Sequence, residues 1–140
     1  MLPLTRLFVA RLGEGAIVQP QGSLRLDFST EPQPDLAVLQ HRDDFYETGS
    51  RPAPNDILLL IDVADTSLRY DLTTKAALYA RHGIGEYWVI DLNSDTVIRH
   101  LEPADGIYHH ITPVAPDAPF APVRLADLTL TPTDVFGPRR

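Results

Sequence analysis

The 140-residue chain contains no cysteine and a single lysine, Lys75. The absence of cysteine excludes disulfide bonds, thiolate metal sites and cysteine nucleophiles. A bound metal ion would therefore need oxygen or imidazole ligands. Because the five histidines show no metal-ligand spacing, carboxylates are the candidate ligands.

Long apolar runs are also missing. No stretch approaches the roughly 20 apolar residues that a membrane span needs, and Met1 to Arg6 does not begin a secretory signal. We therefore expect a soluble, cytoplasmic protein without membrane contact. The net charge of -7 argues against a broadly basic surface for nucleic acid. Carboxylates gathered at a metal site would account for part of that charge.

With 44% hydrophobic residues, the chain suffices for one domain, residues 1–140, that buries roughly two thirds of the surface of its unfolded chain. Apolar periodicity and turn residues divide this domain into short elements. Residues 41–55 form a polar loop, and residues 125–136 fit a strand or a helical turn equally well. Helices are predicted at residues 4–12 and 67–82, and strands at 16–18, 23–28, 35–39, 56–63, 86–92, 96–101 and 108–112.

The strand at residues 56–63 contains an unbroken apolar run, as found in central strands that are covered on both faces. Asp62 lies at its end and shares a face with Leu58 and Leu60 by alternation. The order strand, helix, strand indicates a right-handed crossover between parallel strands. The predicted fold class is therefore α/β, with a central mixed β-sheet flanked by helices and hairpins at one edge. Free strand edges favour a homodimer.

Lys75 occupies an unusual position for a lysine. Within the predicted helix it shares one stripe with Leu72, Ala76, Tyr79 and Ala80, at spacings of three and four residues. Its ammonium group therefore points inward, where it is unfavourable unless an anion meets it. The alternative is a lysine whose stem packs on Leu72 while its head reaches water.

Two aspartates in apolar, strand-like runs before this helix can supply the anion. Asp35 and Asp62, together with Lys75, form a pattern suited to phosphodiester cleavage. Carboxylate oxygens suit Mg2+ or Mn2+, and such an ion polarises a phosphate and lowers the pKa of a bound water. The lysine would stabilise the developing negative charge. Alone, Asp35 fits a turn residue and Asp62 a carboxylate that caps the following backbone.

Several segments in this order resemble the Uma2 family, also called DUF820, of endonucleases in the PD-(D/E)XK, or restriction-endonuclease-like, superfamily. The likeness is close over residues 34–92 and looser in the flanks. The segments that carry it are Pro34-Asp35, Leu60-Ile61-Asp62-Val63-Ala64-Asp65-Thr66-Ser67, Tyr70-Asp71 with Lys75 and Tyr79, and Gly83-Ile84-Gly85-Glu86-Tyr87-Trp88-Val89-Ile90-Asp91.

The resemblance implies a restriction-endonuclease-like core and specific roles for these residues. Asp35 would be the aspartate of the proline-aspartate motif, and Asp62 the second acidic metal ligand. The motif position for lysine, two residues after Asp62, is Ala64, so Lys75 on the following helix would replace it. Tyr79 lies one turn later and would orient a phosphate or the lysine, although it also fits a half-buried packing residue. Asp35, Asp62, Lys75 and Tyr79 are thus the candidate catalytic residues.

The chain departs from the family pattern in two ways. Asp62 stands where glutamate is usual, which withdraws the carboxylate by about one methylene; a misplacement near 1 Å can cost about a hundredfold in rate. We also expect the chain to lack the helical N-terminal part of family members. Two functions follow: a Mg2+- or Mn2+-dependent DNA endonuclease, and a nuclease-fold protein without catalysis that serves as a binding or assembly module. Arg42 and Arg51 are weaker candidates for phosphate contact.

Overall fold

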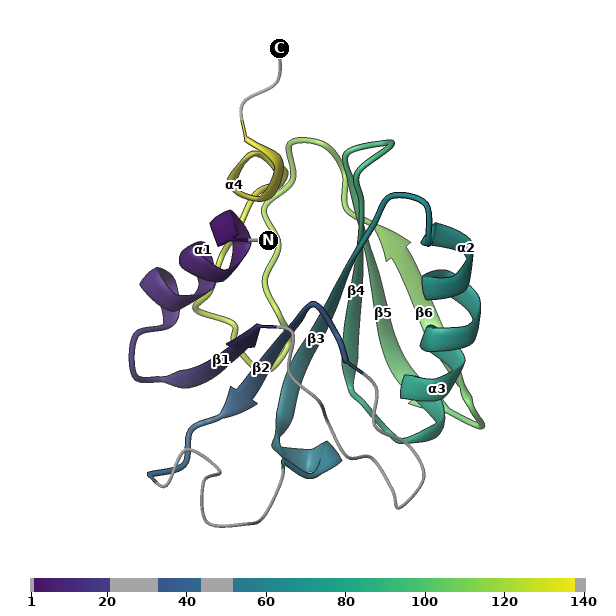
Figure 1. Cartoon of the computed structure of the whole chain (residues 1–140), viewed down its shortest axis with the longest axis horizontal. Helices are drawn as coiled ribbons and strands as arrows, with labels where there is room; N and C mark the ends of the chain where they lie inside the picture. Colours follow the sequence, from purple (N-terminus) through teal and green to yellow (C-terminus); the bar gives the residue numbers. More distant parts are fainter. Residues whose placement is uncertain (1, 21–32, 44–51, 138–140) are drawn as a thin grey trace.

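The computed structural model describes residues 2–20, 33–43 and 52–137, which form a six-stranded mixed sheet with helices on both faces (Figure 1). The strands follow one another across the sheet in chain order, and each neighbouring pair is antiparallel except β3 and β4, which are parallel. The predicted α/β class is confirmed. The strand predicted at residues 23–28 lies outside the described residues. The strands are β1 (Ala16–Pro20), β2 (Leu36–Gln40), β3 (Ile57–Ala64), β4 (Glu86–Asp91), β5 (Thr96–Ala104) and β6 (Ile107–Pro113).

Helices cover both faces of this sheet. In Figure 1, α1 and α4 lie on one side of the sheet and α2 and α3 on the other, which gives three layers. The connection between the parallel strands β3 and β4 runs through α2 and α3, as predicted for residues 56–92. The helical elements are α1 (Leu2–Leu12), η1 (Pro54–Asp56), α2 (Leu68–Tyr70), η2 (Asp71–Lys75), α3 (Ala76–Arg81) and α4 (Pro132–Phe136).

The helix predicted at residues 67–82 exists, but it is not a uniform α-helix. Its middle, η2, is a π-helical segment in which Ala76 N–H donates to the Asp71 carbonyl five residues earlier. Single π turns within α-helices are rare and occur often at functional sites. The helix ends before Gly83, whose φ of 76° is the left-handed conformation expected at that position.

Two hydrophobic cores follow from the two covered faces. Leu59, Ile61 and Trp88 pack with α1 and the C-terminal segment, whereas Leu60, Ala64 and Tyr87 pack with α3. The alternation explains why the central strands read as continuous apolar runs, since both faces are buried. Burial on both sides also fixes where the polar exceptions in these strands can point.

A bulge in β3 corrects one prediction about its faces. Val38 pairs with Leu59 and Leu39 pairs with Ile57, so Leu58 is an extra residue in the register. Leu58 consequently packs in the core beneath α1, while Leu60 packs in the core beneath α3. Asp62 therefore shares its face with Leu60, as predicted, but not with Leu58, because a bulge interrupts the two-residue alternation.

Of the two structures that the sequence left open for residues 125–136, the short helix forms. Phe120 and Leu130 form an isolated antiparallel bridge, and α4 follows at Pro132. The Thr131 hydroxyl accepts a hydrogen bond from Asp134 N–H, and the Asp134 carboxylate accepts one from Thr131 N–H, which caps this short helix. The segment thereby closes the core on the α1 side.

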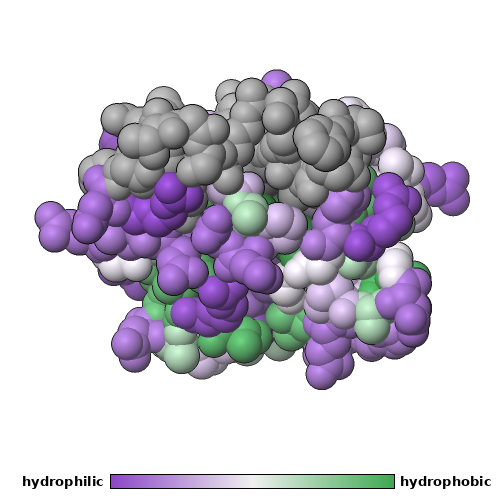
Figure 2. Space-filling view, turned by 90° about the horizontal axis from the view of Figure 1, so that it is seen from below, coloured by the Kyte–Doolittle hydropathy of each residue, from purple (hydrophilic) through white to green (hydrophobic). Residues whose placement is uncertain are grey.

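The described surface offers no sign of a membrane span. No helix among residues 2–20, 33–43 and 52–137 is both long and apolar enough to cross a bilayer. On the described part of the face drawn in Figure 2, hydrophilic side chains predominate and hydrophobic ones gather in a smaller area. This distribution suits a chain with 22% charged residues.

Candidate active site

Asp35 and Asp62 face one another across two antiparallel strands. Asp35 immediately precedes β2, and the pairing of Leu36 with Ile61 places it opposite Asp62 of β3. Asp35 N–H donates to Asp62 Oδ1 at 3.2 Å, and Val63 N–H donates to Asp35 Oδ2 at 2.7 Å. Backbone hydrogen bonds therefore hold both carboxylates in the geometry that the strand pairing sets up.

Lys75 meets this pair from the helical side. Its Nζ lies 2.9 Å from Asp62 Oδ2, and the side chains of Lys75 and Asp62 are 19% and 2% exposed. The prediction that Lys75 points inward toward an aspartate is confirmed. A buried carboxylate of this kind would be costly without a partner, and the lysine supplies the compensating charge.

Tyr87 is a third partner of Asp62 that the sequence did not reveal. Its hydroxyl donates to Asp62 Oδ2 at 2.9 Å and also lies 3.2 Å from the Asp71 carbonyl oxygen. Burial, together with the charges of Asp62 and Asp71, raises the pKa of Tyr87, so the hydroxyl keeps its proton and acts as a donor. The sequence does not indicate this role, because Tyr87 lies in an apolar strand and its partner is 25 residues away.

Tyr79 lies deeper than its predicted role suggested. Its side chain is fully buried, and its ring packs edge-on against Tyr87 with centroids 4.8 Å apart. Within the described part of the chain, its hydroxyl has no hydrogen-bond partner. The structure therefore brings Tyr79 next to the Asp62 site through Tyr87, and no direct hydrogen bond joins it to Lys75.

Asp71 is a further buried carboxylate near the site. It begins the π-helical segment and accepts a hydrogen bond from the Ser67 hydroxyl at 3.0 Å. Burial raises the pKa of Asp71, the Ser67 bond opposes this shift, and the charge of Asp62 adds to it. The sequence placed Asp71 in a segment of the family resemblance but did not reveal its electrostatic link with Asp62.

The two aspartates form a small donor set for a metal ion. Over the described ranges, no group of three or more histidine, aspartate or glutamate side chains is arranged to hold a metal. Mg2+ is nevertheless commonly bound through one or two carboxylates, with waters and substrate phosphates as the remaining ligands. Asp35 Oδ1 accepts no hydrogen bond from the described residues, so the oxygen ligands present fit such an ion.

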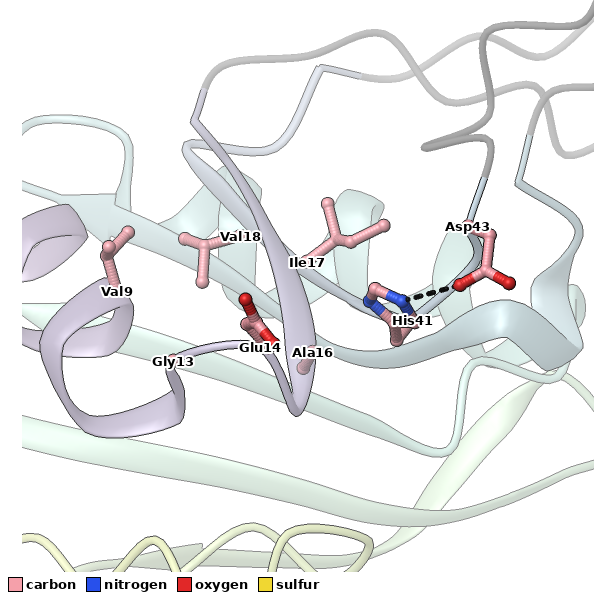
Figure 3. Close-up of a pocket in the computed structure, with 8 residues that line it drawn as sticks. All are labelled: Val9, Gly13, Glu14, Ala16, Ile17, Val18, His41 and Asp43. Atoms are coloured by element: carbon pink, nitrogen blue, oxygen red, sulfur yellow. Dashed lines mark hydrogen bonds and ion pairs between the residues drawn. The ribbon is translucent and has the colours of Figure 1, made fainter.

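A separate hollow of about 390 Å3 lies beside α1 and β1 (Figure 3). His41 and Asp43 stand at one side of it, with His41 Nε2 3.2 Å from Asp43 Oδ1, and Glu14 stands at the other. The hollow is lined by none of the predicted site residues. Arg42 is described but Arg51 is not, so their contact with phosphate stays a prediction.

Comparisons with known proteins agree with the fold and with the family resemblance. A family model described as "Uma2: Putative restriction endonuclease" matches residues 3–133. Among solved structures, the chain is similar to "a putative nuclease belonging to DUF820" from Anabaena variabilis ATCC 29413, with a TM-score of 0.73. The sequences are 17% identical, and the match covers 95% of this chain and 75% of that chain. A comparison with curated proteins found no match.

Proposed function

The chain belongs to the Uma2 family, and on this premise we propose that it is a metal-dependent DNA endonuclease with Asp35, Asp62 and Lys75 at its active site. One observation carries the proposal: Lys75 Nζ lies 2.9 Å from Asp62, whose backbone-anchored neighbour is Asp35. Two carboxylates and an ammonium group from three segments of the chain converge: Asp35 just before β2, Asp62 on β3 and Lys75 at the end of the π-helical segment.

Asp35 and Asp62 would hold Mg2+ or Mn2+ in this proposal. Both present the hard oxygen atoms that these ions prefer. The bound ion would polarise the scissile phosphate and favour deprotonation of an attacking water. The strand pairing between β2 and β3 supports the role of the aspartates, because it fixes the two carboxylates before any ligand arrives.

Lys75 would stabilise negative charge on the phosphate during hydrolysis. Its ammonium group has three N–H donors, and Asp62 accepts from one of them. The others would bind phosphate oxygens as water adds to phosphorus and the bond to the leaving oxygen breaks. Tyr79 would contribute through its packing against Tyr87, since its buried hydroxyl is remote from solvent.

Plasmid nicking with Mn2+ tests the proposal. Wild-type protein should convert supercoiled DNA to the open-circular form, and Asp62→Asn should abolish this because the amide cannot supply the carboxylate charge. Asp62→Glu adds the methylene that the family usually has and should leave cleavage similar or lower if the aspartate is a competent ligand. Recovery of cleavage by Asp62→Glu in an otherwise inactive protein would instead mark Asp62 as the cause of lost activity.

The second candidate is a nuclease-fold protein that binds or assembles without catalysis. The observation that favours it is the donor count at Asp62, whose carboxylate already accepts hydrogen bonds from Lys75, Tyr87 and Asp35 N–H. Failure of both wild type and Asp62→Glu to cut DNA with Mg2+ or Mn2+, with the fold intact, would favour this candidate. DNA as substrate and a homodimer as the active form stay predictions.

A further inference from the structure

The hydroxyl of Tyr87 touches the carboxylate that the proposed function depends on. In the parallel pairing of β3 and β4, Tyr87 lies opposite Leu60. Leu60 precedes Asp62 by two residues and lies on the same face of the sheet. The Tyr87 side chain therefore reaches along the sheet to Asp62 Oδ2. The ring is completely buried, so the hydroxyl meets protein atoms and no bulk solvent.

The hydrogen bonds at Asp62 divide unequally between its two oxygens. Oδ2 accepts from Lys75 Nζ and from Tyr87, both at 2.9 Å. Oδ1 accepts from Asp35 N–H at the longer distance of 3.2 Å. Since a carboxylate oxygen has two lone-pair sites, Oδ2 is filled by its two donors, whereas Oδ1 keeps one site on the side of Asp35.

The surroundings of Tyr87 fix the direction of its hydroxyl. The ring lies against Tyr79, with centroids 4.8 Å apart, and against His100, with centroids 5.2 Å apart. The Asp71 carbonyl, 3.2 Å from the hydroxyl, also receives the π-type hydrogen bond from Ala76 N–H. Tyr87 thereby connects Asp62 to the π-helical segment whose last residue is Lys75.

We propose that Tyr87 is a positioning residue that orients the Asp62 carboxylate for a divalent cation, by occupying Oδ2 with Lys75 and leaving Oδ1 available beside Asp35. This inference rests on the proposed role of Asp62 as a metal ligand. Partners that orient a metal ligand typically change metal affinity about 10- to 100-fold when they are removed. A tyrosine that only fills the core would have no such effect once its ring volume is kept.

The test compares Tyr87→Phe with Tyr108→Phe. Tyr108 is a matched control because it is also buried, packs in the same aromatic cluster and donates its hydroxyl to the Ile84 carbonyl at 2.7 Å, away from Asp62. Both variants keep the ring and lose one buried hydrogen bond. Mn2+ binding is measured by titration calorimetry, and the Asp35 amide is followed by 15N–1H NMR without metal.

We expect Tyr87→Phe to weaken Mn2+ binding about tenfold or more and to shift the Asp35 amide signal, because Asp35 N–H bonds to Asp62 Oδ1. Tyr108→Phe should change neither. Replacement of Tyr87 by 4-aminophenylalanine, which retains the ring and an N–H donor, should restore both readouts. Wild-type affinity with an unmoved Asp35 amide in Tyr87→Phe would overturn the inference, as would equal losses in both phenylalanine variants.

Absence of Mn2+ binding in the wild type would refute the proposed function, and the Asp35 amide would then decide the orienting role alone. A shift confined to Tyr87→Phe would support Tyr87 as the residue that orients Asp62. No shift would contradict it.

Discussion

Two buried ion pairs lie on opposite faces of the sheet, and the hydrogen bonds at their carboxylates differ. Glu86 of β4 faces the core beneath α1, and its Oε2 accepts from Arg99 at 2.8 Å and from Trp88 Nε1 at 2.7 Å. Its Oε1 accepts from Val123 N–H at 2.8 Å. Arg99 also donates to the Ala121 carbonyl, so the pair attaches the C-terminal segment to the sheet.

The pair between Asp62 and Lys75 on the other face has a longer hydrogen bond at its second oxygen than Glu86 has, and it lies beside a second carboxylate, Asp35. Asp62 Oδ1 accepts one long hydrogen bond and, within the described part of the chain, Asp35 Oδ1 accepts none. The nearby Tyr79 hydroxyl is likewise without a partner among the described residues. Buried ion pairs occur for structural reasons as well as functional ones. The two pairs are similarly buried, so the long bond at Asp62 Oδ1 and the neighbouring Asp35 Oδ1, rather than burial, separate the candidate active site from the structural pair.

Replacing the basic residue of each pair should affect DNA cleavage very differently, and this is the largest effect that we predict. Lys75→Met keeps the apolar stem but removes the charge that would stabilise the transition state. If the wild type nicks plasmid DNA with Mn2+, this variant should be slower by about 100- to 1,000-fold. Arg99→Met should retain the rate within about threefold at a temperature where it is folded. Equal losses in both variants would remove the distinction between the two pairs.

Stability should respond in the reverse order. Arg99→Met leaves Glu86 buried at 2% exposure without its charge partner, and the loss of one member of such a pair typically costs about 3–5 kcal/mol. We expect a loss near the lower value, because the Arg99 side chain is 19% exposed. Lys75→Met also leaves a buried carboxylate without its charge partner, but its loss should be smaller, because Arg99 additionally donates to the Ala121 carbonyl. Urea unfolding of both methionine variants checks this. A smaller loss in Arg99→Met than in Lys75→Met would contradict the structural role of the Glu86 pair.

Mild acid should weaken the aromatic cluster behind the Asp62 site. Burial lowers the pKa of His100, whose ring lies beside Tyr87. His100 therefore binds a proton near pH 6.5 in the unfolded chain but not in the folded protein. The stability that comes from this difference is present above pH 6.5 and is lost as the pH falls through the lower pKa of the folded state. Wild-type unfolding free energy should fall between pH 7 and pH 5 more steeply than that of His100→Gln. Parallel slopes in urea titrations would count against this.

The smallest predicted effect concerns Asp71, where charge near Asp62 is unfavourable. Burial, and the charge of Asp62, raise the pKa of Asp71 in the folded state. The stability that Asp71 contributes is present at pH values below its unfolded-state pKa of 3.8. It is lost as the pH rises through the higher pKa of the folded state. Asp71→Asn, which can still accept from Ser67, should therefore gain a few tenths of a kcal/mol at pH 7. Thermal unfolding at pH 3 should show no gain.

The sequence predicted the parts of the site that depend on local periodicity. The stripe containing Lys75 placed its ammonium inward, and the strand, helix, strand order placed β3 and β4 parallel. The π-helical segment at Asp71–Lys75 was missed, because one changed turn barely alters the spacing of apolar residues. The bulge at Leu58 was missed because register depends on the partner strand.

Contacts between residues far apart in sequence were the main omission. Tyr87 and Trp88 are adjacent in an apolar strand, yet their polar atoms bond to Asp62 on one face and Glu86 on the other. Nothing in the local pattern distinguishes such side chains from simple packing residues. The pairing of Arg99 with Glu86 likewise depends on the antiparallel register of β4 and β5, in which Trp88 lies opposite Arg99.

Calorimetric titration of Mn2+ into wild type, Asp35→Asn and Glu86→Gln tests the central distinction most directly. The Asp62 site, with Asp35 beside it, should bind the ion, and the Glu86 pair should not take part. We predict a binding event at millimolar or lower metal in wild type, its loss in Asp35→Asn and its retention in folded Glu86→Gln. No binding in wild type at millimolar Mn2+, or binding that survives Asp35→Asn unchanged, would contradict the account.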